Sequence, residues 1–126
     1  MKKSLKYNLT YIGGISGYDK RAIYTLNLKT DHFSVDGIFK SKKFLYADII
    51  EVYFGEVDYL KGKLDIVREL MIDHLALLDR RLNRKLKYCL VIVLKEGAIV
   101  FSEEYDGIIK VAYERLIKIR ESTLVK

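Results

Sequence analysis

The chain has 126 residues, of which half are hydrophobic and about a third are charged. This length fits one domain with one apolar core. Aromatic and β-branched residues occur along the whole chain, which excludes an intrinsically disordered protein. The formal net charge of +6 favours an anionic partner: an acidic protein face, an anionic membrane or a nucleic acid.

Alternation of apolar and polar residues predicts the first two strands. Leu5 to Tyr11 and Ala22 to Leu28 each show the period of two that is typical of a half-buried strand. Gly13, Gly14 and Gly17 lie between them and indicate a turn or a bulge. A phosphate-binding loop is not favoured there, because no Gly-Lys-Ser/Thr sequence follows.

Three more short extended segments are predicted next. The third strand begins at His32 and contains Gly37, which indicates a bulge or a local twist. Residues 40–43 form a basic turn that leads into an apolar segment at residues 44–46. Another strand covers residues 50–54.

The apolar spacing then changes from strand to helix. Residues three or four apart form one apolar stripe, which consists of Leu60, Leu64, Val67, Met71, Leu75, Leu78 and Leu82. This spacing predicts an amphipathic helix at about residues 60–84. The stripe is longer than the cover of a small sheet requires. Its members Leu60, Leu64, Val67, Met71, Leu75 and Leu78 therefore either pack on the sheet or form an interface with a partner.

The densest basic run, residues 80–87, lies at the end of this predicted helix. Cations are favourable at the carboxyl end of a helix because they interact with its dipole. The same run also suits an anionic membrane surface or a nucleic-acid backbone. No stacking-aromatic motif accompanies it, so nucleic acid is the least favoured of these partners.

A strand of apolar character follows at residues 88–94, with hydrophobic side chains on both of its faces. Such a strand is expected to lie in the middle of a sheet and to be covered on both sides. Cys89, the single cysteine, lies within it. We expect a small buried core residue there and not a nucleophile, because a reactive thiol needs exposure and a lowered pKa.

The end of the chain is predicted to be a hairpin and a helix. Glu96 and Gly97 indicate a tight turn into a strand at residues 98–102. Asp106 is a candidate N-cap for the last helix, in which apolar residues from Ile109 onward follow at helical spacing.

Five segments in this order carry a resemblance to a known family: residues 9–14, 28–33, 44–49, 94–97 and 106–120. Together they resemble the bacterial pleckstrin-homology-like domains, which are related in fold to pleckstrin-homology and GRAM domains. The resemblance implies a single domain over residues 1–126 with an α+β, mainly β fold. This fold is a strongly bent, antiparallel seven-stranded barrel capped by a carboxyl-terminal helix, so the helix at about 60–84 is an insertion.

The resemblance also implies a candidate anion site. In lipid-binding members, basic residues of the first and third strand-connecting loops meet at the open end of the barrel. The candidate anion- or lipid-binding residues of this chain are Lys20, Arg21, Lys40, Lys42 and Lys43. The alternative is a solvated cluster of loop charges. The family's lipid motif has a lysine near the end of the first strand, where this chain has Tyr11 and Ile12.

We expect no enzymatic activity, no cofactor and no metal site. His32 and His74 are the only histidines and belong to different predicted elements, and no spacing of Cys or His supplies further metal ligands. No set of residues meets the geometric roles that a catalytic mechanism requires.

The sequence therefore predicts a non-catalytic binding or adaptor module located in the cytoplasm. The first hypothesis is that it binds a protein partner, or a second copy of itself, through the apolar stripe. The alternative is peripheral binding of anionic membrane lipid, or of another phosphorylated ligand, through the basic loops. No apolar run reaches the length that spans a bilayer, and the amino-terminal segment does not match a signal peptide.

Overall fold

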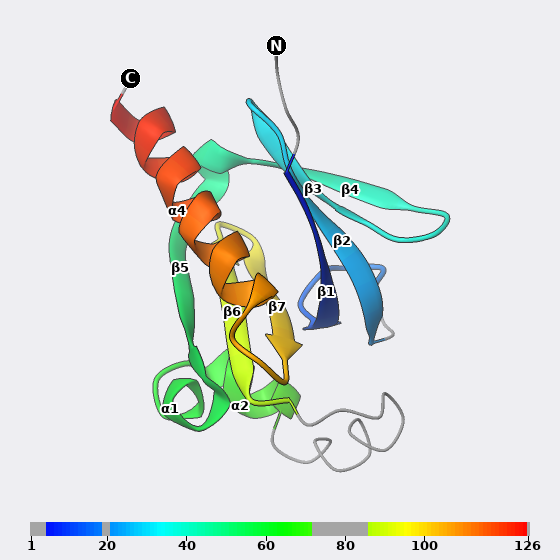
Figure 1. Ribbon diagram of the computed structural model, residues 1–126, viewed down its shortest axis with the longest axis vertical. Coiled ribbons are helices and arrows are strands. Elements are labelled where there is room, and N and C mark those ends of the chain that lie inside the picture. The colour runs from blue at the N-terminus through cyan, green and yellow to red at the C-terminus, as the bar shows by residue number, and fades with distance from the viewer. Residues whose placement is uncertain (1–4, 19–20, 72–85, 126) are drawn as a thin grey trace.

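The computed structural model describes residues 5–18, 21–71 and 86–125 (Figure 1). In this part of the chain it contains one antiparallel sheet of seven strands, a short 3₁₀ helix and three α-helices. The strands are β1 Leu5–Gly13, β2 Ala22–Leu28, β3 His32–Asp36, β4 Ser41–Leu45, β5 Ile49–Glu56, β6 Tyr88–Leu94 and β7 Gly97–Glu103. The helices are η1 Tyr46–Asp48, α1 Val57–Lys61, α2 Asp65–Met71 and α4 Ile108–Val125.

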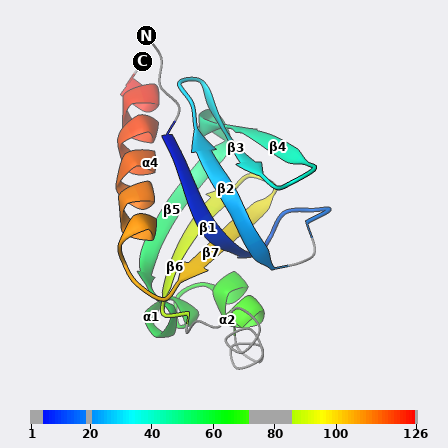
Figure 2. The same cartoon turned by 45° about the vertical axis from the view of Figure 1, so that its right-hand side comes forward.

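The strand order in the sheet is β4-β3-β2-β1-β7-β6-β5. Each strand pairs with a sequence neighbour, and the pairing of β1 with β7 joins the first four strands to the last three. We call these groups the N-terminal half and the C-terminal half of the sheet. Figure 2 shows that the strands of the two halves run in crossing directions, with α4 along one side.

The main core lies between the two halves and α4. Helix α4 contacts β1, β5, β6 and η1. The buried side chains of this core come from both halves of the sheet and from the helix, and they include Leu9, Leu26, Phe33, Leu90, Ile92, Phe101, Ile109 and Leu116. The expected apolar spacing of the last helix is thus explained, because its buried residues all face the sheet.

A second core covers the opposite face of the C-terminal half, under α1 and α2. Its buried members are Ile12, Val57, Leu60, Val67, Leu86, Cys89, Val91 and Val100. Strand β6 lies between β5 and β7 and contributes alternate residues to the two cores. The prediction that residues 88–94 form a central strand covered on both sides is confirmed.

The predicted helix at about 60–84 is wrong in its first part. Helix α1 ends at Lys61, and a turn separates it from α2, which begins at Asp65. Gly62 lies in this turn, and glycine is about 1 kcal/mol less favourable than alanine inside a helix. Residues 72–84 of the predicted helix lie outside the described residues.

The predicted basic turn at residues 40–43 is also wrong, because β4 already begins at Ser41. The turn covers residues 37–40, where the Gly37 N–H donates to the Lys40 carbonyl at 2.7 Å. Phe44 lies opposite Phe33 in the β3–β4 pairing, and the two rings stack with centroids 5.3 Å apart. This contact fixes the register of the hairpin, so the lysines that follow the turn, Lys42 and Lys43, belong to β4.

Two details of the loops complete the fold. The pairing of β1 with β7 shifts register between Tyr11 and Gly13, and Gly14 has φ +110°, so the predicted glycine-dependent bend is confirmed. Helix α4 begins at Ile108, and the Gly107 carbonyl accepts from the Val111 N–H at 3.2 Å. Gly107 therefore occupies the N-cap position that was predicted for the residue before it.

Candidate functional site

Buried tyrosines hold the loop between β1 and β2 against the sheet. The Tyr11 hydroxyl accepts from the Ile15 N–H at 2.8 Å and donates to the Tyr18 carbonyl at 2.9 Å. The Tyr18 hydroxyl donates to the Val35 carbonyl of β3 at 3.0 Å. Burial is the main cause that raises the pKa of Tyr18, so the phenol stays a neutral donor. These bonds give the loop a fixed shape.

Lys40 connects this loop to the β3–β4 hairpin. Its Nζ atom donates to the Gly17 carbonyl at 2.7 Å and lies 4.5 Å from the centroid of the Tyr18 ring. The first and third connections of the sheet therefore meet at one end of the N-terminal half. We call residues 14–18 and 36–43 the loop end.

The described members of the five predicted anion-binding residues do not all point to the same place. Arg21 donates from its guanidinium to the Leu70 carbonyl of α2, and its partial burial lowers its pKa. Arg21 thus points to the second core and not to the loop end. Lys20 lies outside the described residues.

The three lysines of the hairpin remain exposed. Lys42 pairs with Val35 and lies 5.9 Å from the centroid of the Phe44 ring, whereas Lys43 pairs with Ser34. Because consecutive strand residues point to opposite faces, Lys42 and Lys43 extend to the two sides of the hairpin. Lys40, Lys42 and Lys43 therefore lie on different sides of the hairpin.

Asp36 is the only acidic residue of the hairpin segment 36–43. Burial opposes its ionisation, but hydrogen bonds from Ser41, Ser34 and Asn27 and the charge of Lys29 outweigh that effect. The pKa of Asp36 consequently lies below its usual value. Its negative charge is satisfied inside the chain, so the exposed surface of the hairpin is positive.

Sequence reasoning missed two residues of the loop end, Ile38 and Phe39. They occupy the middle of the turn, and 90% and 97% of their surfaces are exposed. Turn positions favour Gly, Asn, Asp and Ser, because these residues suit the backbone or hydrogen-bond to it. The available signal was a pair of large apolar residues between Gly37 and Lys40, outside the alternation of the strand.

The members of the predicted partner interface that the structure describes, Leu60, Leu64 and Val67, pack within their own chain. Leu60 and Val67 are 1% and 0% exposed and belong to the second core, and half-buried Leu64 packs against them. The side chain of Met71 and all of Leu75 and Leu78 lie outside the described residues. Of the two expected arrangements, packing on the sheet is the one that the described part of the stripe adopts.

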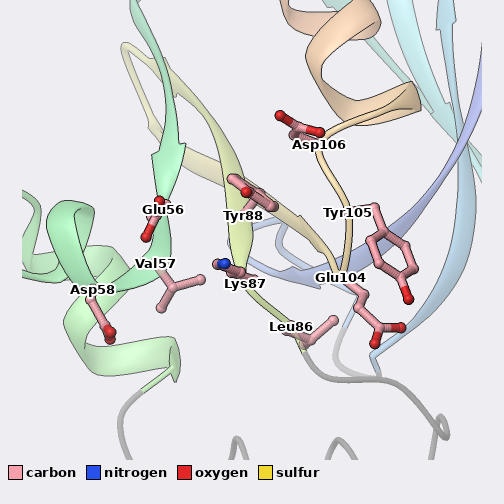
Figure 3. A pocket seen from close by; sticks show the side chains of 9 residues that line it. All are labelled: Glu56, Val57, Asp58, Leu86, Lys87, Tyr88, Glu104, Tyr105 and Asp106. Atoms are coloured by element: carbon pink, nitrogen blue, oxygen red, sulfur yellow. The ribbon is translucent and has the colours of Figure 1, made fainter.

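Figure 3 shows a cleft between the start of α1, the start of β6 and the connection from β7 to α4. Its volume is about 480 Å³, and its lining consists of Glu56, Val57, Asp58, Leu86, Lys87, Tyr88, Glu104, Tyr105 and Asp106. The backbone of Lys87 forms the floor, since its carbonyl accepts from the Val57 N–H at 2.8 Å and its N–H donates to the Glu103 carbonyl at 3.0 Å. The lining has four carboxyl groups and one amine, so the cleft has the opposite sign to the chain as a whole.

A second cleft of about 460 Å³ adjoins this one and shares Glu104 and Tyr105 with it. It lies near Ile23 of β2 and Ile108 of α4. Both clefts are electrostatically suited to a cationic group. In the described part of the chain no three His, Cys, Asp or Glu side chains are placed to hold a metal ion.

The titratable groups considered for catalysis are buried or paired. Cys89 is fully buried, and burial raises the pKa of its thiol to about 11, although a hydrogen bond with Ser102 opposes the shift. The His32 Nδ1 atom lies 2.7 Å from a carboxylate oxygen of its neighbour Asp31. His74 lies outside the described residues.

Comparisons with protein-family models, with curated proteins and with solved structures found no match. None of the helices in the described ranges combines the length and the apolar character needed to cross a bilayer.

Proposed function

We propose that this chain is a non-catalytic binding module of the pleckstrin-homology-like type. Three features support the fold assignment: the sheet order β4-β3-β2-β1-β7-β6-β5, the crossing of the two halves, and a last helix that packs on both halves. This is the arrangement that the sequence resemblance implies. Domains with one fold bind many kinds of ligand, so the function has to be argued from the surface.

We further propose that the module binds a phosphate-bearing anionic ligand through the loop end. The observation that carries this proposal is the charge of the β3–β4 hairpin. It exposes Lys40, Lys42 and Lys43, while its one carboxylate, Asp36, is engaged with Ser41 and Asn27. Three cations against this one carboxylate leave the protruding hairpin with a net positive charge, which attracts phosphate oxygens.

The burial of the described part of the apolar stripe favours this ligand over a protein partner on α1 and α2. Leu60 and Val67 make the second core and leave little apolar surface for an interface at their positions. Each cation near an anionic membrane surface contributes about 1 kcal/mol, and salt screens this attraction. Binding through the loop end is therefore expected to weaken as the salt concentration rises.

Charge reversal on the hairpin tests the proposal. The variant Lys42→Glu/Lys43→Glu is compared with Lys110→Glu/Lys118→Glu, which changes the net charge equally on exposed positions of α4. Sedimentation with vesicles of equal parts phosphatidylcholine and phosphatidylserine, and titration with inorganic tripolyphosphate, distinguish a lipid source of phosphate from a soluble one. We expect the hairpin variant to bind about 30-fold or more weakly at low salt and the α4 variant to bind nearly as the wild type. Equal losses in both variants would show that net charge alone drives the binding.

A further inference from the structure

The apex of the β3–β4 hairpin has a composition that the fold does not require. Ile38 and Phe39 are 90% and 97% exposed, and no described residue covers them. Gly37 and Lys40 on either side are joined by the hydrogen bond that closes the turn. Two large apolar side chains in this position add nothing to either core and reduce solubility. Their role therefore concerns something outside the folded chain.

The lysines around the apex limit the kind of molecule that Ile38 and Phe39 can contact. Lys40 adjoins Phe39 directly, and Lys42 and Lys43 follow on β4. At the rise of an extended strand, Lys42 and Lys43 lie about 10 Å behind the apex. An amphipathic element that lies in a membrane buries its apolar part by about 5–10 Å below the headgroups. The distance between the apolar apex and the cations thus matches the distance between the outer acyl region and the lipid phosphates.

The shape of the hairpin also favours a bilayer. Figure 1 shows the connection between β3 and β4 projecting away from α4 and the C-terminal half. A soluble phosphorylated molecule has charge for the lysines but no apolar layer for the apex. A lipid surface provides both, and it needs no preformed pocket for a protruding pair of side chains.

The apex is held in place before any ligand binds. The Ser41 hydroxyl donates to Asp36 at the strand pair next to the turn, and Lys40 contacts Gly17 and the Tyr18 ring. Tyrosine hydroxyls in turn hold Ile15 and Tyr18 of the β1–β2 loop, so Lys40 joins the apex to a hydrogen-bonded part of that loop. A preorganised element loses little conformational entropy when it binds.

We infer that Ile38 and Phe39 insert into the interfacial layer of an anionic bilayer while Lys42 and Lys43 contact the lipid phosphates. This inference rests on the proposed function, because the lysines bring the apex to the surface. It goes further in naming a bilayer, and not a soluble phosphorylated molecule, as the ligand.

A tryptophan reporter tests the insertion directly. The chain has no tryptophan, so Phe39→Trp gives a single probe at the apex, and Tyr59→Trp places a control on α1, where Tyr59 is 60% exposed. The probe vesicles contain equal parts phosphatidylcholine and phosphatidylserine, with and without bromine on the acyl chains. We expect a blue shift and strong quenching by the brominated lipid at position 39, and neither change at position 59. Unchanged emission from position 39 while the protein is vesicle-bound would overturn the inference.

A second variant separates insertion from charge. Ile38→Ser/Phe39→Ser keeps all three lysines and changes only exposed side chains, so its thermal unfolding is expected to match that of the wild type. We expect at least 10-fold weaker binding to the anionic vesicles and unchanged binding of tripolyphosphate.

Full vesicle binding by this variant, together with loss in Lys42→Glu/Lys43→Glu, would overturn the insertion and leave the proposed function standing. Failure of the wild-type chain to bind vesicles would overturn the insertion, and its failure to bind tripolyphosphate as well would overturn both. A lipid-free dimer that the serine variant dissociates would assign the apex to self-association and overturn the inference too.

Discussion

The outer face of the C-terminal half and the apex of the β3–β4 hairpin both present large apolar side chains, but only the first is covered. Leu60 and Val67, on the helices α1 and α2 that cover this face, are almost completely buried, whereas Ile38 and Phe39 are almost completely exposed. A helix holds its apolar residues along one side, and that side can pack on a sheet. Residues in the middle of a turn project away from the strands that support them. A periodic apolar stripe therefore indicates packing inside the folded chain, whereas an apolar pair in a turn indicates a contact with another molecule.

The covered region depends on close approach of backbones, and this gives the largest expected effect. A Cβ atom at Gly14 would lie 1.6 Å from the Ala98 carbonyl oxygen, and Gly14 has φ +110°. We expect Gly14→Ala to lower the free energy of unfolding by about 3 kcal/mol or more, because backbone must move. Gly17 has φ +87°, and a Cβ atom added there would meet no heavy atom within 4 Å, so Gly17→Ala is expected to cost about 1 kcal/mol from backbone strain alone. Urea unfolding measures both, and equal losses would contradict the close contact at Gly14.

Truncation of one apolar side chain in each region compares directly how much the two regions contribute to the free energy of unfolding. Leu60→Ala is expected to lower the free energy of unfolding by about 2–5 kcal/mol, since it removes a buried side chain from the second core. Ile38→Ala is expected to change it by less than about 0.5 kcal/mol, since that side chain is already in solvent. Chemical denaturation of the two variants checks this. A large loss from Ile38→Ala would mean that the apex packs within the chain.

A small, pH-dependent effect concerns Asp36, the acidic residue next to the turn of the hairpin. In the folded chain the pKa of Asp36 lies below its ordinary value of 3.8. Its charged form therefore stabilises the fold at pH values above the unfolded pKa. This contribution is lost as the pH falls through the lower folded value. Solvent screening at a partly exposed site limits it to about 1 kcal/mol. Between pH 7 and pH 2, the unfolding free energy of Asp36→Asn is expected to fall less than that of the wild type. An equal fall of the unfolding free energy in the two proteins would contradict a stabilising charge at Asp36.

Local patterns in the sequence predict much of this fold. Period-two alternation locates the strands of the sheet, and the doubly apolar run at residues 88–94 identifies β6 as the strand buried on both faces. The pattern fails at the third connection. There, Lys40 to Lys43 have the polarity of a turn, but the stacking of Phe33 on Phe44 sets the register and makes most of them strand.

The candidate site was harder to predict because contacts between residues far apart in the sequence decide where its charged side chains lie. The bond from Arg21 to the Leu70 carbonyl joins residues 49 positions apart, and no local pattern indicates it. The bridge from Lys40 to Gly17 likewise becomes visible only when the two connections meet. Of the three lysines predicted for the third connection, only Lys40 lies in it, because Lys42 and Lys43 belong to β4. The sequence analysis did not identify the apolar pair beside Lys40.

Strand β4 has a further consequence for the protein at high concentration. It is the last strand of the sheet, and in the described part of the chain no other strand pairs with its outer side. An open margin of this kind is a template on which the same strand of another molecule can add, and an apolar tip nearby would promote such fibrous growth. Lys42 and Lys43 give every copy the same charge along this margin, and the strand is only five residues long. This shared positive charge and the shortness of β4 both oppose strand addition between copies.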